Sequence, residues 1–144
     1  MLLPIALTAA GAVALLHIWL SVRVIQVRRS AGVAHGDGGN PMLTRRMRAH
    51  ANFVENAPFF LILLVLLELA GASAELLWGA MILFIAARLA HAFGMDRSGA
   101  PPLRIVGIVV SWTVIGALGI WAIALTYGQP GTADRQRAVT EVAS

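Results

Sequence analysis

The chain has 144 residues, of which 58% are hydrophobic and only 12% are charged, about half the charged share of an average soluble domain. Its formal net charge is +4 and its 11 basic residues are all arginines; because these lie beside apolar stretches, we exclude nucleic acid as a partner. The absence of cysteine excludes disulfides, thiolate metal sites and a nucleophilic thiol of its own. The composition therefore predicts one all-α membrane domain surrounded by lipids, with no metal site.

The first apolar run predicts a membrane span over residues 2–25. The run is long enough to cross a hydrocarbon layer of roughly 30 Å, and Arg23, Arg28 and Arg29 follow it. Because no positive segment precedes it, the run is not typical of a signal peptide, and we expect a retained helix.

A glycine-rich connection follows at residues 29–44. Its GDGG segment predicts a tight turn or a nest of backbone N–H groups, because glycine tolerates positive φ. Asp37 in this segment has two interpretations: it orients a ligand amine, or it is a solvated turn residue. The segment is not a phosphate-binding P-loop, since the required spacing and the Lys-Ser/Thr pair are missing.

The second predicted span covers residues 42–70 and begins as an arginine-rich polar helix. Asn40 is the expected N-cap, and Pro41 suits the first helical turn. Six side chains then share one arc, roughly 100° wide on a 3.6-residue period: Arg45, Arg48, Asn52, Glu55, Asn56 and Phe59. Polar groups at this depth in hydrocarbon are costly unless they are paired, so they usually mark a site.

The far half of this span contains a proline and leads to a short hairpin. Pro58 predicts a kink that would let a ligand reach between helices. Glu68 and Glu75, on either side of the hairpin, are expected to face water.

The third and fourth predicted spans cover residues 76–93 and 103–127, with a breaker-rich loop between them. Arg88 and His91 lie near the end of the third span, and Arg104 lies at the start of the fourth. The four spans together predict an integral membrane four-helix bundle over residues 1–127.

Residues 128–144 form a polar C-terminal tail. Nine arginines lie near the two long connections, whereas only Arg135 and Arg137 lie on the other side, in this tail. The positive-inside rule then places both connections in the cytoplasm and both termini on the non-cytoplasmic side.

Arginines from all four predicted helices gather at one membrane face: Arg28, Arg48, Arg88 and Arg104. Asn52, Glu55 and His91 lie at a similar depth. Snorkelling of long side chains to headgroups accounts for four other arginines, Arg23, Arg29, Arg46 and Arg97. Asparagine and glutamate are too short to snorkel far, so the cluster favours a small, anionic, cytoplasmic ligand, with carboxylates for the arginines and an amine or amide for Glu55 and Asn52. Glutathione, with two carboxylates, an ammonium group and a thiol, meets this description.

The same residues resemble a known family. RMRAHANFVENAPF at 46–59, AHGDGGN at 34–40 and ARLAHAFG at 87–94 are similar to the bacterial branch of the MAPEG family (membrane-associated proteins in eicosanoid and glutathione metabolism). The resemblance implies a homotrimer in the bacterial inner membrane, with glutathione bound between subunits at the cytoplasmic side. It also implies that Arg104 stabilises the glutathione thiolate, and it implies five glutathione contacts, Arg28, Arg48, Asn52, Glu55 and His91.

Three positions depart from the family's better-studied enzymes. Those enzymes often have tyrosine where this chain has Met95, and some have serine at Ile105 or arginine at Ala51.

The expected function is a glutathione transferase or peroxidase acting on a lipophilic small-molecule substrate. The alternatives are a small membrane transporter and a non-catalytic membrane protein whose polar cluster only fixes packing. A proton-coupled exporter would need an acidic residue deep in the first helix, where this chain has only His17.

Overall fold

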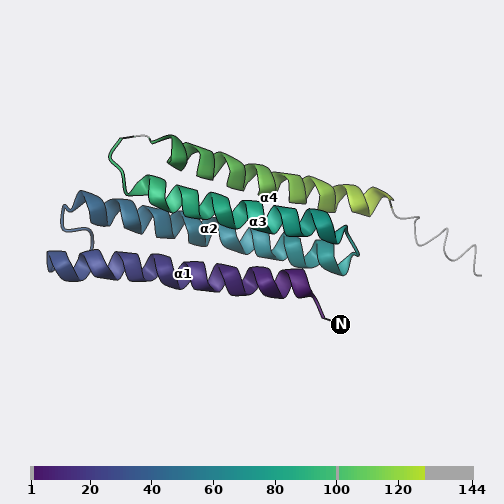
Figure 1. Ribbon diagram of the computed structural model, residues 1–144, viewed down its shortest axis with the longest axis horizontal. Helices are drawn as coiled ribbons and strands as arrows, with labels where there is room; N and C mark the ends of the chain where they lie inside the picture. Colours follow the sequence, from purple (N-terminus) through teal and green to yellow (C-terminus); the bar gives the residue numbers. More distant parts are fainter. Residues whose placement is uncertain (1, 100, 129–144) are drawn as a thin grey trace, which may run out of the picture.

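The computed structural model describes residues 2–99 and 101–128. It contains four long antiparallel helices (Figure 1), α1 (Pro4–Ala31), α2 (Pro41–Leu69), α3 (Ala74–Met95) and α4 (Pro102–Gly128). Each is long and apolar enough to cross a membrane, which confirms the predicted all-α membrane architecture. The tail predicted after residue 128, with Arg135 and Arg137, lies outside the described residues.

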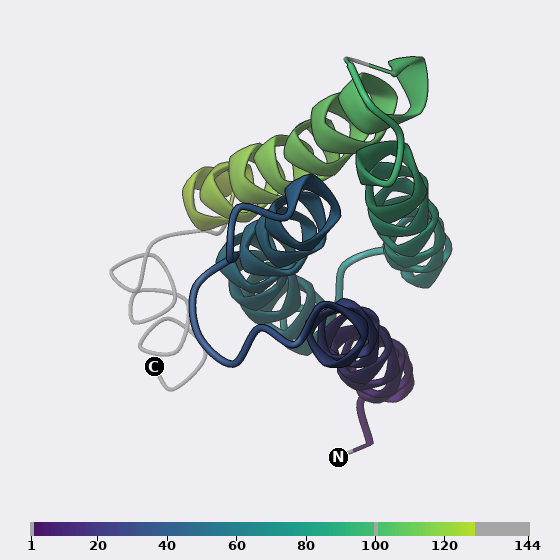
Figure 2. The ribbon, with the colours of Figure 1, turned by 90° about the vertical axis from the view of Figure 1, so that its left-hand side faces the viewer.

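The four helices pack as two pairs around one apolar core. α1 packs mainly against α2 and α3 mainly against α4, and α2 contacts both α4 and α3 between the two pairs; Figure 2 shows this arrangement end-on. Phe60 of α2 stacks on Phe84 of α3, with ring centroids 4.0 Å apart. A Cβ atom on Gly107 would lie 2.6 Å from the carbonyl oxygen of Ala87, so α4 approaches the α3 backbone closely because residue 107 lacks a side chain.

We call the end of the bundle that carries the 32–40 and 96–101 connections the loop end. α2 begins there as predicted, because the Asn40 side-chain oxygen accepts hydrogen bonds from the backbone N–H groups of Met42 and Leu43, at 3.0 and 3.1 Å. α2 then continues through Pro58 without ending. An apolar groove of about 380 Å³ lies beside Pro58, between α1 and α2.

The prediction that Glu68 faces water is wrong. Its two carboxylate oxygens accept hydrogen bonds from the backbone N–H groups of Ile5 and Ala6, at 3.0 and 2.7 Å. These N–H groups belong to the first turn of α1, where intrahelical acceptors are missing and negative charge is favoured. The residue at the N-cap, Leu3, makes no side-chain cap. A side chain from the end of α2 therefore caps the start of α1.

Replacing Glu68 with alanine is expected to lower the free energy of unfolding by about 1.5 kcal/mol, because two N–H groups of α1 lose a charged acceptor. Thermal denaturation of the detergent-solubilised protein measures this loss. Glu75→Ala is the matched control, since Glu75 is an exposed carboxylate at the same end of the bundle. Equal losses in the two variants would contradict the capping role.

Candidate functional site

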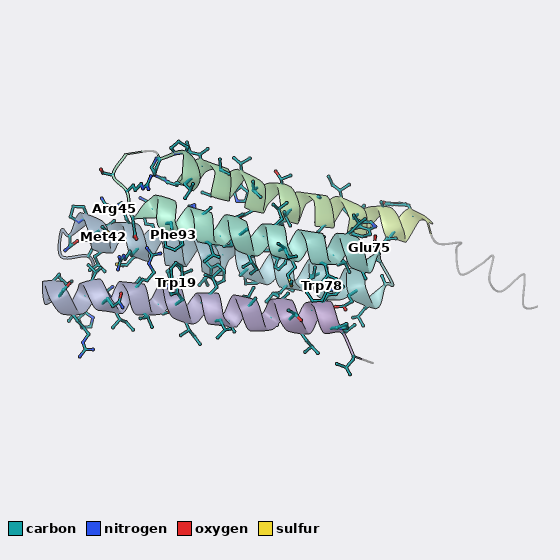
Figure 3. All side chains as sticks on the ribbon, viewed as in Figure 1. Trp19, Met42, Arg45, Glu75, Trp78 and Phe93 are labelled. Carbon is teal, nitrogen blue, oxygen red and sulfur yellow. The ribbon has the colours of Figure 1, made fainter. Side chains whose placement is uncertain are left out.

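A polar cleft of about 410 Å³ opens at the loop end, and we call it the arginine cleft. Three of its lining residues are arginines, Arg45 and Arg48 from the first turns of α2 and Arg104 from the first turn of α4. Asp37 and Gly39 of the 32–40 connection, two further α2 residues (Pro41 and Thr44) and Met95, the last residue of α3, complete the lining. Figure 3 shows Arg45 on α2 at this end, with Glu75 and Trp78 at the opposite end. The cleft thus combines three guanidinium groups with one carboxylate.

Asp37 both closes the turn and lines the cleft. Its carboxylate accepts hydrogen bonds from the Gly39 backbone N–H at 3.0 Å and from the Thr44 hydroxyl at 2.9 Å. The Gly39 N–H, and after it the Thr44 hydroxyl, hold the pKa of Asp37 below its usual value. Gly38 has a φ of 55°, and a Cβ there would lie 2.6 Å from the Val33 side chain, so this turn requires glycine. The carboxylate is therefore ionised and held in place at the cleft wall.

Arg28, expected to contact glutathione, lies behind the same turn. One terminal nitrogen donates to the carbonyl oxygens of Ala34 and Gly36, at 3.3 and 2.8 Å, and the other lies 3.4 Å from the Met47 sulfur. In the described part of the chain Arg28 does not line the arginine cleft. It supports the 32–40 connection that forms one wall of the cleft.

Asn52 and Glu55 continue the polar face of α2 beyond Arg48. The Asn52 side-chain oxygen accepts a hydrogen bond of 2.7 Å from Arg88. Glu55 is exposed, and neither residue lines the cleft in the described part of the chain. Arg88 is 2% exposed and also donates to the Ser111 hydroxyl at 3.2 Å. It is enclosed between α2, α3 and α4 rather than placed at the membrane face.

His91, another expected contact, is buried between α3 and α4 with 2% of its surface exposed. Its Nδ1 atom lies 3.2 Å from the carbonyl oxygen of Arg104, so a protonated Nδ1 donates to the first turn of α4. This bond holds the backbone from which the Arg104 side chain enters the cleft. His91 therefore reaches the cleft only through Arg104.

Among the sequence-predicted site residues, the structure brings Arg48 and Arg104 together in the cleft. Arg45, which is not among the expected glutathione contacts, joins them; its i, i+3 spacing to Arg48 puts both side chains on one helix face and is the sequence signal for this position. Met95 also lines the cleft, so α3 supplies no hydroxyl donor at that position. The lining side chains that can bind an anion strongly are the three arginines.

The interpretation of Arg23 and Arg46 as snorkelling residues is wrong. Arg23 is 7% exposed, pairs with Asp96 and lies over the Trp19 ring, 4.5 Å from its centroid. Arg46 pairs with the same carboxylate at 3.2 Å and donates to the carbonyl oxygen of Arg23 at 3.0 Å. Asp96 directly follows Met95, so this network joins α1 and α2 to the end of α3 and fixes one wall of the cleft. Figure 3 labels Trp19 beside Phe93 at this junction.

The chain matches the MAPEG family over residues 6–124. It is also 36% identical over 84 residues to the inner membrane protein YecN of Escherichia coli K12, and equally to the protein of that name from Escherichia coli O6:H1. The aligned region covers 58% of this chain and 64% of each relative. The chain thus spans a little under two thirds of the length of these curated relatives.

Proposed function

Because this chain belongs to the MAPEG family, we propose that it is a membrane-bound, glutathione-dependent transferase or peroxidase. The proposed substrates are lipophilic electrophiles or hydroperoxides that arrive from the bilayer, and the arginine cleft is the proposed glutathione site. The observation that carries the proposal is the convergence of Arg45, Arg48 and Arg104 with the Asp37 carboxylate in one cleft.

The charges of the cleft match those of glutathione. A guanidinium group binds a carboxylate through two parallel hydrogen bonds, and three arginines are sufficient for two carboxylates and one further anionic group. Asp37, whose carboxylate is held ionised by Gly39 and Thr44, provides a counter-charge for the ammonium group. The cleft volume of about 410 Å³ lies within the range typical of small-molecule sites.

Arg104 is the proposed catalytic residue. Glutathione supplies a thiol, which has a pKa near 8.5 when free and reacts as the thiolate. The Arg104 guanidinium lies at the N-terminus of α4, where the helix dipole also favours negative charge. Together these groups are expected to lower the thiol pKa by about two units, or roughly 2.7 kcal/mol of anion stabilisation. No general base from the protein is then required.

We further propose that the chain lies in the bacterial inner membrane as a homotrimer, with the loop end and the cleft in the cytoplasm. The names of the two relatives and the excess of arginines at the loop end support this placement. In such a trimer Arg28 and Glu55, which do not line the cleft of their own subunit, would meet glutathione bound by a neighbouring copy. Exposed apolar side chains on α1 and α4 would offer contact surface to lipids and to the lipophilic substrate.

Arg48→Ala is expected to raise the dissociation constant for glutathione about thirtyfold, because a charged, bidentate hydrogen-bond donor worth about 2 kcal/mol is lost. Isothermal titration calorimetry of the purified protein in detergent measures this change. Arg29→Ala is the matched control, since Arg29 is exposed at the same end of the bundle and does not line the cleft. Equal affinities in wild type and Arg48→Ala would remove the arginine cleft from the proposal.

A further inference from the structure

Arg88 is the largest side chain that the described bundle encloses completely. Among the described residues it has no carboxylate partner, and its Nε atom makes no hydrogen bond. A buried cation without a counter-ion is costly in a membrane protein, so such residues usually serve a site. Its two terminal nitrogens donate to Asn52 of α2 and Ser111 of α4. These two side chains are therefore the groups that Arg88 could hold in position for a site.

The contact with Asn52 determines how the Asn52 amide is oriented. A guanidinium group only donates hydrogen bonds, so the amide must present its Oδ1 atom to Arg88, at 2.7 Å, and direct its NH₂ group elsewhere. Asn52 is partly exposed and lies one helical turn after Arg48, which lines the cleft. In the described structure the Nδ2 atom of Asn52 donates to no protein group. Its N–H groups are therefore available to a ligand that lies along this face of α2.

We propose that Arg88 is a positioning residue for glutathione. It holds the Asn52 amide in an orientation in which Nδ2 donates to a carbonyl or carboxylate oxygen of the glutathione that Arg48 and Arg104 bind. The cation also polarises the amide and strengthens its N–H groups as donors. This role rests on the proposed function. It extends that function to Arg88, which does not line the cleft.

Arg88→Met tests the role, because methionine fills similar space and removing a cation with no counter-ion leaves no buried charge unpaired. The dissociation constant for glutathione is expected to rise about tenfold, as expected for one lost hydrogen bond to a charged ligand. Asn52→Ala is expected to have the same effect, and the double variant is expected to bind as weakly as either single variant. Ser111→Ala is the control, since it removes the other Arg88 contact and should leave the affinity within about twofold.

A second substitution keeps the proposal testable if Arg88→Met does not fold. Asn52→Asp retains an oxygen toward Arg88, so the variant should fold, but it replaces the donating NH₂ with a carboxylate oxygen. Its dissociation constant for glutathione is expected to rise at least tenfold. Unchanged affinity in Arg88→Met or Asn52→Asp, or losses that add in the double variant, would overturn the positioning role alone. A wild-type protein that does not bind glutathione would overturn the proposed function and this role with it.

Discussion

Glutathione bound to an Arg104→Ala variant is expected to ionise about two pH units higher than glutathione bound to the wild type. Arg104 lines the cleft from the first turn of α4, where its guanidinium and the helix N-terminus both favour an anion. If the thiol pKa returns from about 6.5 to its free value near 8.5, the thiolate fraction at neutral pH falls about 25-fold. The ultraviolet absorbance of the thiolate, followed across a pH titration of the complex, measures this change.

The pH dependence of turnover is a second test of the Arg104→Ala variant. The pH at which glutathione-dependent conversion of a chlorodinitrobenzene-type electrophile reaches half its maximum should rise by the same two units. The loss in maximal rate will be smaller, because a thiolate with a higher pKa is intrinsically more nucleophilic. Arg97→Ala is the control, since Arg97 is exposed in the α3–α4 connection at the same end of the bundle and does not line the cleft. An unshifted titration in Arg104→Ala would remove Arg104 from the mechanism.

Asp96→Asn is expected to lower the free energy of unfolding by about 3 kcal/mol. The carboxylate pairs with Arg23 and Arg46, and its neutralisation leaves the Arg23 guanidinium buried at 7% exposure without a counter-charge. Removing one partner of a buried ion pair is costly because the remaining charge stays in a poor solvent. Thermal denaturation in detergent measures the loss, which is the largest stability effect expected here.

The control for Asp96→Asn is Glu55→Gln, which neutralises an exposed carboxylate that makes no ion pair within the described residues. Its effect is expected to stay within about 0.5 kcal/mol. Asp96→Asn should also weaken glutathione binding, because Met95 at the cleft wall is held by the network next to it. Equal stability losses in the two variants would show that the Arg23–Asp96–Arg46 network stabilises the protein no more than the exposed Glu55 carboxylate does.

The sequence predicted those features that depend on neighbouring residues along the chain. The four helices follow from long apolar runs, and the Asn40 cap of α2 follows from a side chain two and three residues before the N–H groups it binds. The shared face of Arg45 and Arg48 follows from helical periodicity alone. Each of these is a local property, so no packing information was needed.

Contacts between helices were not predictable in the same way. Glu68 caps α1, Arg23 pairs with Asp96, and Arg88 binds Asn52, and each contact joins residues more than thirty positions apart. Each depends on the rotation and the axial offset of two packed helices, which periodicity within one helix does not determine. Glu68 and Arg23, which were expected to face water or lipid headgroups, are therefore bound by residues from other parts of the bundle.

The central claim is that the arginine cleft binds glutathione, and titration of the wild-type protein in detergent tests it most directly. Calorimetry with glutathione should show saturable binding with a dissociation constant in the millimolar range or below, weakened in Arg48→Ala and unaffected in Arg29→Ala. The absence of saturable heat at millimolar glutathione would contradict the account and would leave a transporter or a non-catalytic membrane protein as the function of this chain.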